Sequence, residues 1–252
     1  MNTLEATYDY RLVALSVVIA IVASYAALDL AGLVTATRNK TRMAWLFGGA
    51  IAMGTGIWAM HYTGMLAYHL QVPIYYHVPT VILSLAAAIG ASFVALFTVS
   101  RENFNALHVV GGSVLMGSGI CAMHYTGMAS MRLSAMHEWD TGFVTASIAI
   151  AVVVSAVALV LTFLFREDKP SITWKMMCAV MMGLAIPAMH YTAMFAVTYT
   201  RTDDTPDLTN AIDISALAST AIIAISFVLL VSVVLVRRWT IVPARSAAVN
   251  RA

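Results

Sequence analysis

Seven long apolar stretches separated by short polar segments dominate the pattern of this 252-residue chain. A helix needs about 20 mostly apolar residues to cross a bilayer, and each stretch reaches that length. We therefore predict an all-α integral membrane protein, a seven-transmembrane helix bundle that occupies residues 1–252 as a single domain. The predicted spans are about 11–36, 43–68, 79–99, 107–131, 143–165, 174–199 and 212–236.

Composition supports this interpretation, because 61% of the residues are hydrophobic and only 10% are charged. A water-soluble domain needs more charge than that to cover its surface. The expected partner is the lipid bilayer, and no nucleic-acid partner is expected. The first apolar stretch follows Glu5 and Asp9 and has no basic start, so it is not a cleaved signal peptide. Cys121 and Cys178 differ in helix depth by roughly 13 Å, which is too far for a disulfide.

The distribution of basic residues predicts the orientation of the bundle. One set of loops, together with the C-terminal tail, holds 11 of the 14 Lys and Arg residues, and the opposite set holds 3. Loops rich in Lys and Arg stay in the cytoplasm, so we expect the N-terminus outside and the C-terminus inside a bacterial inner (cytoplasmic) membrane. The larger set is Arg38, Lys40, Arg42, Arg101, Arg166, Lys169, Lys175, Arg237, Arg238, Arg245 and Arg251, and the smaller is Arg11, Arg132 and Arg201.

One segment occurs three times, each time inside an apolar stretch. Residues 53–65 read MGTGIWAMHYTGM, residues 116–128 read MGSGICAMHYTGM, and residues 182–194 read MGLAIPAMHYTAM. The offsets of 63 and 66 residues correspond to two spans each. We therefore predict three two-helix repeats plus a seventh helix. The repeats are about 11–68, 79–131 and 143–199, and the seventh helix is about 212–236.

The second, fourth and sixth spans run in the same direction, so the three motifs lie at one depth near the outer face. Packing with threefold pseudosymmetry would point His61, His124 and His190 at a shared centre. A glycine seven residues before each histidine lies on the same helix face and allows neighbouring backbones to approach closely. These close-packing glycines are Gly54, Gly117 and Gly183.

The chemistry of the motif favours a metal site. The third copy differs from the first at several positions, yet its Met-His-Tyr-Thr core is intact, and ionisable groups at membrane depth are usually functional. Imidazole suits copper, zinc, iron and nickel, whereas thioether sulfur selects copper. Zinc usually recruits Cys, Asp or Glu alongside His, and the spans offer almost none. The expected ligands are His61, His124, His190, Met60, Met123 and Met189, with Met65, Met128 and Met194 as alternatives.

Purely structural roles for the motif residues compete with a metal site. Each histidine could be a core residue bonded to a backbone carbonyl, and methionines often only fill a core. Tyr62, Tyr125 and Tyr191 could orient the imidazoles as hydrogen-bond partners or form an aromatic belt at the interface. Among other residues, Asp29 either pairs with a polar group or lies near the headgroups. His69, His77 and His137 belong to surface loops or to a route for metal, and Pro187 should bend the sixth span.

The triplicated motif resembles the MHYT domain, a bacterial integral membrane sensor module. The stretch SYAALDLAG at 24–32 also resembles the first span of that family, and the resemblance covers residues 8–236. It implies copper bound through the Met, His and Tyr residues of the motif, and a stimulus that is a diatomic gas such as oxygen, carbon monoxide or nitric oxide. It also implies a cytoplasmic output partner, either a cyclic-di-GMP enzyme or a histidine kinase.

The sequence thus predicts a copper-binding sensor domain, not an enzyme, that transmits a gas, copper or redox signal to the cytoplasm. Two other functions stay open. A copper- or haem-dependent membrane oxidoreductase would use the same histidines, although haem is less favoured because no attachment motif is present. A metal-ion transporter would need a continuing polar or soft path, which Met53, Met116 and Met182 could provide.

Overall fold

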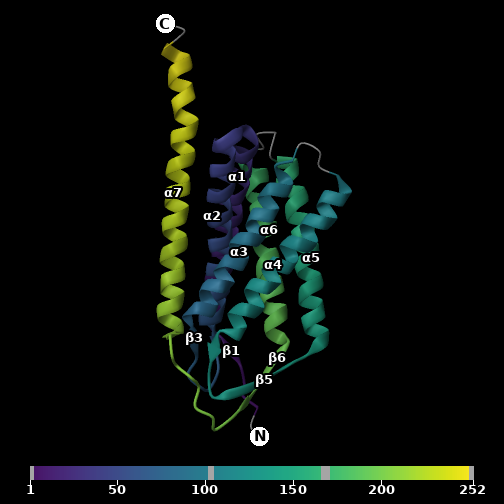
Figure 1. Ribbon diagram of the computed structural model, residues 1–252, viewed down its shortest axis with the longest axis vertical. Helices are drawn as coiled ribbons and strands as arrows, with labels where there is room; N and C mark the ends of the chain where they lie inside the picture. Colours follow the sequence, from purple (N-terminus) through teal and green to yellow (C-terminus); the bar gives the residue numbers. More distant parts are fainter. Residues whose placement is uncertain (1–2, 102–104, 166–170, 250–252) are drawn as a thin grey trace.

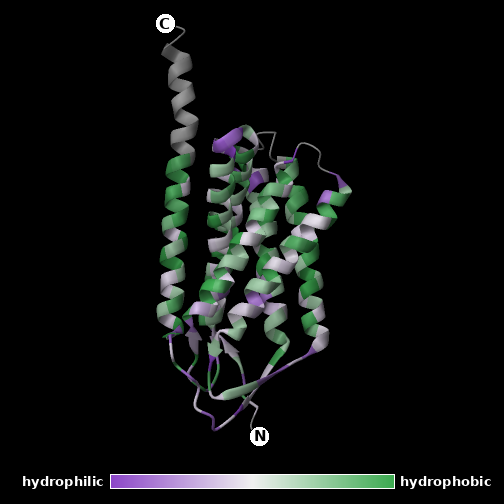
Figure 2. Ribbon diagram, viewed as in Figure 1, coloured by the Kyte–Doolittle hydropathy of each residue, from purple (hydrophilic) through white to green (hydrophobic). Residues whose placement is uncertain are grey.

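The computed structural model describes residues 3–101, 105–165 and 171–249, and these ranges contain seven long helices arranged as a bundle (Figure 1). All seven are long and apolar enough to cross a membrane, and their ribbons are mostly hydrophobic (Figure 2). This confirms the predicted class. The helices are α1 (Tyr10–Ala36), α2 (Asn39–Ala67), α3 (Val78–Val99), α4 (Ala106–Ala129), α5 (Thr141–Phe165), α6 (Ile172–Phe195) and α7 (Ile214–Val249).

Short antiparallel strands gather at the end of the bundle where the N-terminus lies, which we call the strand end (Figure 1). β1 pairs with β2, β3 lies between β4 and β7, and β5 pairs with β6. Strands of two to five residues are too short to give a period-two signal, so the sequence did not predict them. They are β1 (Thr7–Tyr8), β2 (Tyr68–His69), β3 (Tyr75–His77), β4 (Met131–Arg132), β5 (Ala135–Trp139), β6 (Val197–Arg201) and β7 (Ala211–Asp213).

These strands explain where the predicted span boundaries were wrong. The spans predicted to end at 131 and 199 end as helices at Ala129 and Phe195, because the chain enters β4 and β6. The seventh helix begins at Ile214, since the residues before it form β7. The N-terminus lies at the strand end and the C-terminus at the opposite end (Figure 1), as an odd number of spans requires. Of the basic residues counted above, Arg166, Lys169 and Arg251 lie outside the described residues.

Side chains just before the helices satisfy backbone donors that a helix start leaves unpaired. The Asp9 carboxylate accepts a hydrogen bond from the backbone N–H of Arg11 at 2.9 Å, before α1. Asn105 accepts from the N–H of His108 before α4. Ser171 accepts from the N–H of Trp174 before α6. These polar residues therefore mark the points where the chain leaves a loop and becomes helical.

Six helices form a closed ring, in which each packs against its neighbours in chain order and α6 returns to α1. Helix α7 stands outside this ring, mainly against α2. The motif helices α2, α4 and α6 each approach the next helix around the ring through the glycine seven residues before the motif histidine. A Cβ on Gly54, Gly117 or Gly183 would lie within 2.9 Å of the backbone of α3, α5 or α1, respectively. The contact of α6 with α1 is thus the third copy of one repeated helix contact.

A salt bridge joins the same two helices near the end opposite the strands. Asp29 on α1 accepts a hydrogen bond from Lys175 in the first turn of α6, and the Lys175 ammonium lies 4.1 Å from the centroid of the Tyr25 ring. Of the two alternatives for Asp29, the structure shows pairing with a polar group of the bundle. Lys175 was counted with the cytoplasmic loops, although the predicted sixth span began at 174; it lies inside α6, which begins at Ile172. Both cysteines are free and buried.

Candidate metal centre

The three motif histidines meet at the centre of the ring, near the strand end. Their Nδ1 atoms are separated by 3.1 Å (His61 to His190), 3.3 Å (His61 to His124) and 3.2 Å (His124 to His190). The rings stand nearly perpendicular to one another, with interplanar angles of 81–88°. All three side chains are buried, with at most 1% of their surface exposed. The arrangement is a three-bladed propeller whose inner atoms are nitrogen.

The size of this nitrogen triangle suits one metal ion. The centre of a triangle with 3.2 Å edges lies about 1.8 Å from each corner, whereas imidazole nitrogen binds a metal such as zinc at about 2.0–2.1 Å. An outward shift of about 0.2 Å per nitrogen would match that bond length. The three atoms belong to the one cluster of potential ligand groups that the described residues contain, with donor atoms within 4.8 Å of one another.

Hydrogen bonds alone satisfy this cluster poorly. Three neutral imidazoles carry three N–H donors and three acceptor lone pairs. Each Nδ1 has either one hydrogen or one lone pair in its ring plane, so the triangle closes at most one well-directed N–H···N bond. The Nε2 atoms of all three rings find no hydrogen-bond partner among the described residues. Unpaired buried polar atoms are costly and rare in native proteins. A cation at the centre would take up all three Nδ1 lone pairs together and place each ring hydrogen on Nε2, which would still have no partner among the described residues.

Glycines of the motif leave room for the outer edges of the imidazoles. A Cβ on Gly64 would lie 2.7 Å from Nε2 of His190, and a Cβ on Gly127 would lie 2.4 Å from Nε2 of His61. The rings of His190 and His61 therefore extend over the backbone of α2 and α4, respectively. In the third repeat the equivalent position is Ala193, which is fully buried. The sequence showed these glycines within the repeat but gave no reason to connect them with the histidines.

The motif tyrosines bond to serines on the neighbouring helix rather than to a motif histidine. The hydroxyl of Tyr62 lies 3.3 Å from Oγ of Ser84 on α3, that of Tyr125 lies 2.6 Å from Ser147 on α5, and that of Tyr191 lies 2.9 Å from Ser16 on α1. The edge of each tyrosine ring contacts the histidine before it, with centroids 4.7–5.0 Å apart. Tyr62 is fully buried, so it is not part of an exposed aromatic belt.

The serine partners form a repeat that sequence reasoning missed. Each serine hydroxyl donates to the carbonyl three residues earlier, and that residue is a valine in all three cases. The sequence signal for this repeat is the pattern Val-x-x-Ser near the start of α1, α3 and α5. A pattern with only two fixed residues is too common in apolar helices to be recognised. The pairs are Val13 with Ser16, Val81 with Ser84, and Val144 with Ser147.

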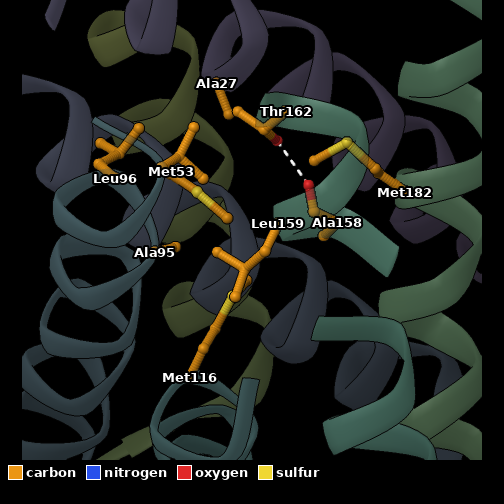
Figure 3. Close-up of a pocket in the computed structure, with 10 residues that line it drawn as sticks. Ala27, Met53, Ala95, Leu96, Met116, Ala158, Leu159, Thr162 and Met182 are labelled. Carbon is orange, nitrogen blue, oxygen red and sulfur yellow. Dashed lines mark hydrogen bonds between the residues drawn. The ribbon is translucent and has the colours of Figure 1, made fainter. Parts of the chain in front are cut away.

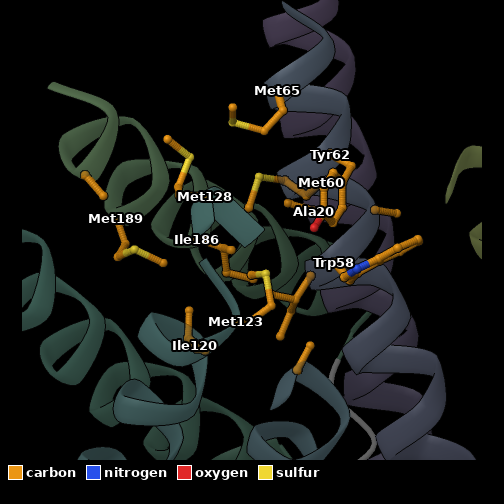
Figure 4. Packing of buried hydrophobic residues seen from close by; sticks show 14 of the residues in the cluster. Ala20, Trp58, Met60, Tyr62, Met65, Ile120, Met123, Met128, Ile186 and Met189 are labelled. Atoms are coloured by element: carbon orange, nitrogen blue, oxygen red, sulfur yellow. The ribbon is translucent and has the colours of Figure 1, made fainter. Parts of the chain in front are cut away.

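The motif methionines belong to the apolar cluster around the histidines. Figure 4 shows Met60 and Met65 of α2 packed with Met123 and Met128 of α4, and Met189 of α6 in the same cluster. Methionines of three helices, all within four residues of a motif histidine, therefore share one buried cluster, and their roles as ligands stay predictions. The set consists of Met60, Met123 and Met189, which are fully buried, and Met65, Met128 and Met194, which are at most 5% exposed.

Aromatic residues of the strand end cover two sides of the centre. Tyr76 of β3 is fully buried and its ring contacts Tyr62, with centroids 5.7 Å apart. Tyr8 of β1 contacts Tyr191, with centroids 5.9 Å apart. Burial raises the pKa of the Tyr76 phenol well above its usual value, and the nearby Tyr62 adds to the rise. The phenol therefore stays protonated and neutral at any physiological pH.

The third side, beside Tyr125, is more open. A cavity of about 380 Å³ there is lined by Tyr125 and Met128 of α4, Met131 of β4, and His137 of β5, among others. His137 and Trp139 on its rim are exposed, and Met128 lies one helical turn beyond His124 on the same face. The cavity thus lies at the strand end of α4, next to the motif residues Tyr125 and Met128, and the three motif histidines are not among its lining residues.

The remaining histidines of the strand end stay apart from the centre. They were assigned to loops, but they lie in strands: His69 in β2, His77 in β3 and His137 in β5. Nδ1 of His69 lies 3.0 Å from the carbonyl oxygen of Ala67, and Nδ1 of His77 lies 2.9 Å from Oγ1 of Thr80. The structure therefore brings together only the three motif histidines among the described residues.

Comparisons with known proteins agree with the repeated motif. The sequence pattern of the MHYT family, described as "Bacterial signalling protein N terminal repeat", matches residues 1–49, 54–112 and 117–173. The bifunctional diguanylate cyclase/cyclic di-GMP phosphodiesterase MucR of Pseudomonas aeruginosa is 43% identical over 197 residues, which are 78% of this chain and 29% of MucR. The signaling protein YkoW of Bacillus subtilis is 37% identical over 78% of this chain and 25% of YkoW.

A third relative is similar in the same way. The cyclic di-GMP phosphodiesterase NbdA of Pseudomonas aeruginosa is 35% identical over 202 residues, which are 79% of this chain and 26% of NbdA. The matched region thus spans only about a quarter of each of these relatives. No solved structure matches the chain.

Proposed function

Because the chain belongs to the MHYT family of bacterial signalling proteins, we propose that it is a membrane sensor domain with a copper ion held between His61, His124 and His190. The observation that carries the proposal is the triangle of Nδ1 atoms with edges of 3.1–3.3 Å. A trigonal nitrogen set with thioethers nearby and no carboxylate or thiolate in the cluster favours copper over zinc. Copper would supply a one-electron redox change and an open position for a small ligand.

The protein's own groups define what such a centre can do. The imidazoles hold the ion from three helices, so a change in the preferred ligand geometry would pull on α2, α4 and α6 together. Burial excludes bulk water from the ring nitrogens. The cavity beside Tyr125 admits a small molecule such as a diatomic gas from the strand end, which we expect to face outside. A shift requires a ligand with different affinities for two arrangements of these helices.

Transmission to the cytoplasm has a physical route in this bundle. Helix α2 carries His61 and is the main contact of α7, and α7 continues to Val249 beyond the end of the ring (Figure 1). The printed names of MucR and NbdA describe enzymes of cyclic di-GMP turnover. We propose that an output module of that kind, or a histidine kinase, receives the movement of α7.

The same geometry argues against haem. A haem bound by two of these histidines would place its macrocycle between their inner nitrogens. Nitrogen atoms 3.1–3.3 Å apart leave room for one ion but not for a ring system. The oxidoreductase alternative would therefore depend on copper alone.

Elemental analysis and electron paramagnetic resonance on protein purified without added metal test the proposal. We expect a variant with His61→Ala, His124→Ala and His190→Ala to contain about one copper per chain fewer than the wild type. His108→Ala is the matched control, since His108 is half-buried at the opposite end of the bundle, where its ring bonds to Asn105. Equal copper in the wild type and the triple variant would disprove the site.

A further inference from the structure

A second set of repeated side chains converges deeper in the ring. Met53, Met116 and Met182 occupy equivalent positions in the three repeats, eight residues before each motif histidine. At 1.5 Å per residue they lie about 12 Å further from the strand end than the imidazoles. All three line one small cavity, as Figure 3 shows. The repeat that joins the histidines therefore also brings three thioethers to one place.

The volume of the cavity is enough for one ion or one water molecule. It leaves about 10 Å³ for the centre of a water-sized sphere, close to the minimum that one water molecule needs. The three methionines are between 3% and 7% exposed, so the guest would be enclosed by sulfur and hydrocarbon. A diatomic or larger ligand would not fit without movement of the helices.

Water is a poor guest for this cavity. A buried water needs two to four polar partners, and the polar side chain among the lining residues is that of Thr162. Its hydroxyl donates to the carbonyl oxygen of Ala158 at 2.7 Å (Figure 3), so it offers the cavity only a lone pair. The other lining residues are alanine, leucine, valine and methionine, and no charged side chain is among the lining residues that the structure describes.

Packing alone does not account for the space. Methionine is flexible and normally fills irregular gaps in a core. Here one methionine from each of α2, α4 and α6 lines a gap that the three side chains leave open. Thioether sulfur is a ligand that selects Cu(I) among biological metals. Three neutral, polarisable sulfurs and one hydroxyl oxygen suit a soft monovalent cation better than Zn²⁺ or Mg²⁺, which prefer nitrogen or charged oxygen ligands.

We propose that Met53, Met116 and Met182 form a second metal site, separate from the histidine centre, for a soft monovalent ion such as Cu(I). It would lie about 12 Å from the imidazole layer, deeper in the bundle. The site depends on no property of the histidines. It can therefore be tested whether or not the imidazoles bind metal.

Silver(I) is the probe, because it is soft and monovalent and does not change its oxidation state under the conditions of binding. The purified 252-residue chain would be titrated with Ag(I), and bound silver counted. The test variant is Met53→Leu/Met116→Leu/Met182→Leu, since leucine conserves the volume of methionine. The matched control is Met43→Leu/Met176→Leu/Met181→Leu, whose methionines are 44–53% exposed. We expect the test variant to bind one Ag(I) fewer than the wild type, and the control to bind as many.

X-ray absorption locates the silver independently of its number. In protein with all three motif histidines replaced by alanine, we expect a silver ion with sulfur neighbours, which disappears when the methionine substitutions are added. Unchanged silver binding after those substitutions, or silver without sulfur neighbours in the histidine-free protein, would overturn the proposal. Should the triple leucine variant fail to fold, Met116→Leu alone must still weaken binding by at least about tenfold, a loss that even outer-shell changes cause at metal sites.

The two proposals can fail separately. If the histidine centre holds no metal, the alanine variant and the wild type bind equal numbers of ions, and the sulfur-bound silver is still present. If the methionine site is wrong, the sulfur signal is missing while copper still depends on the histidines.

Discussion

Nε2 of His190 lies 2.7 Å from the point at which Gly64 would carry a Cβ. A real Cβ cannot stay that close to a ring nitrogen, so Gly64→Ala must displace the imidazole or the helix. Because Gly127 has the same relation to His61, at 2.4 Å, we predict that either substitution lowers copper content and thermal stability. Stability should fall by about 1–3 kcal/mol, the usual cost of overpacking a core.

The control for this prediction is Gly48→Ala, since a Cβ there meets nothing within 4 Å. Alanine in a helix is also about 1 kcal/mol more favourable than glycine, so the control should keep its copper and become slightly more stable. A Gly127→Ala variant with wild-type copper content and melting temperature would show that the imidazole does not need this space.

The three histidines should be energetically equivalent. Their nitrogen separations differ by only 0.2 Å, so replacing any one of them removes the same fraction of the ligand set. We predict that His61→Ala, His124→Ala and His190→Ala each weaken copper binding by at least about tenfold, which competition with a copper chelator would measure. If two of them were harmless and one abolished binding, copper would bind one imidazole and not a shared centre.

The tyrosine hydroxyls are predicted to hold helices together and not to bind metal. Tyr125→Phe removes the hydrogen bond to Ser147, and Ser147→Ala removes it from the other side. Each should lower the free energy of unfolding by about 1 kcal/mol, and the double variant should cost little more than either single one, as a double-mutant cycle would show. Copper content should stay at the wild-type value. Loss of copper in Tyr125→Phe would instead make the phenol oxygen a ligand.

The start of α7 should depend on pH through Asp213. A hydrogen bond from the Ser215 hydroxyl, followed by one from its backbone N–H at 2.7 Å, lowers the pKa of Asp213 below the usual 3.8. Because the folded pKa is the lower one, the stabilisation is complete above the unfolded value. It is lost as pH falls through the folded pKa. Amide hydrogen exchange at residues 214–217 should therefore increase below about pH 4, and this pH dependence should vanish in Asp213→Asn.

The salt bridge between Asp29 and Lys175 should stabilise the contact of α1 with α6. Asp29→Asn leaves the Lys175 ammonium without its counter-charge, and we predict a loss of about 1 kcal/mol in unfolding free energy, since the Asp29 side chain is 40% exposed. Asp29→Asn combined with Lys175→Met should recover most of it, because an apolar replacement of both charges is often neutral. Thermal unfolding in detergent measures both; no recovery in the double variant would contradict this account.

The sequence predicted the parts of this structure that a pattern can encode. Seven apolar stretches and a triplicated segment were enough to predict the bundle and the shared depth of His61, His124 and His190. The distance between their nitrogens could not be predicted, because it depends on how closely the helices approach at glycines. The hydrogen bond between Tyr191 and Ser16 could not be predicted either, since it joins residues 175 positions apart in the sequence. The strands were missed because they are short.

The bond between Tyr191 and Ser16 has a consequence for how many repeats the fold can contain. Ser16 plays for Tyr191 the part that Ser84 and Ser147 play for the other two motif tyrosines. The last two-helix unit is therefore completed by the first helix of the chain. Each unit turns by about a third of a circle, as the head-to-tail interface of a three-subunit ring would. Three units close such a ring, two leave it open, and a fourth has no place in it. Gene duplication could thus proceed only to this copy number while keeping the imidazoles in contact.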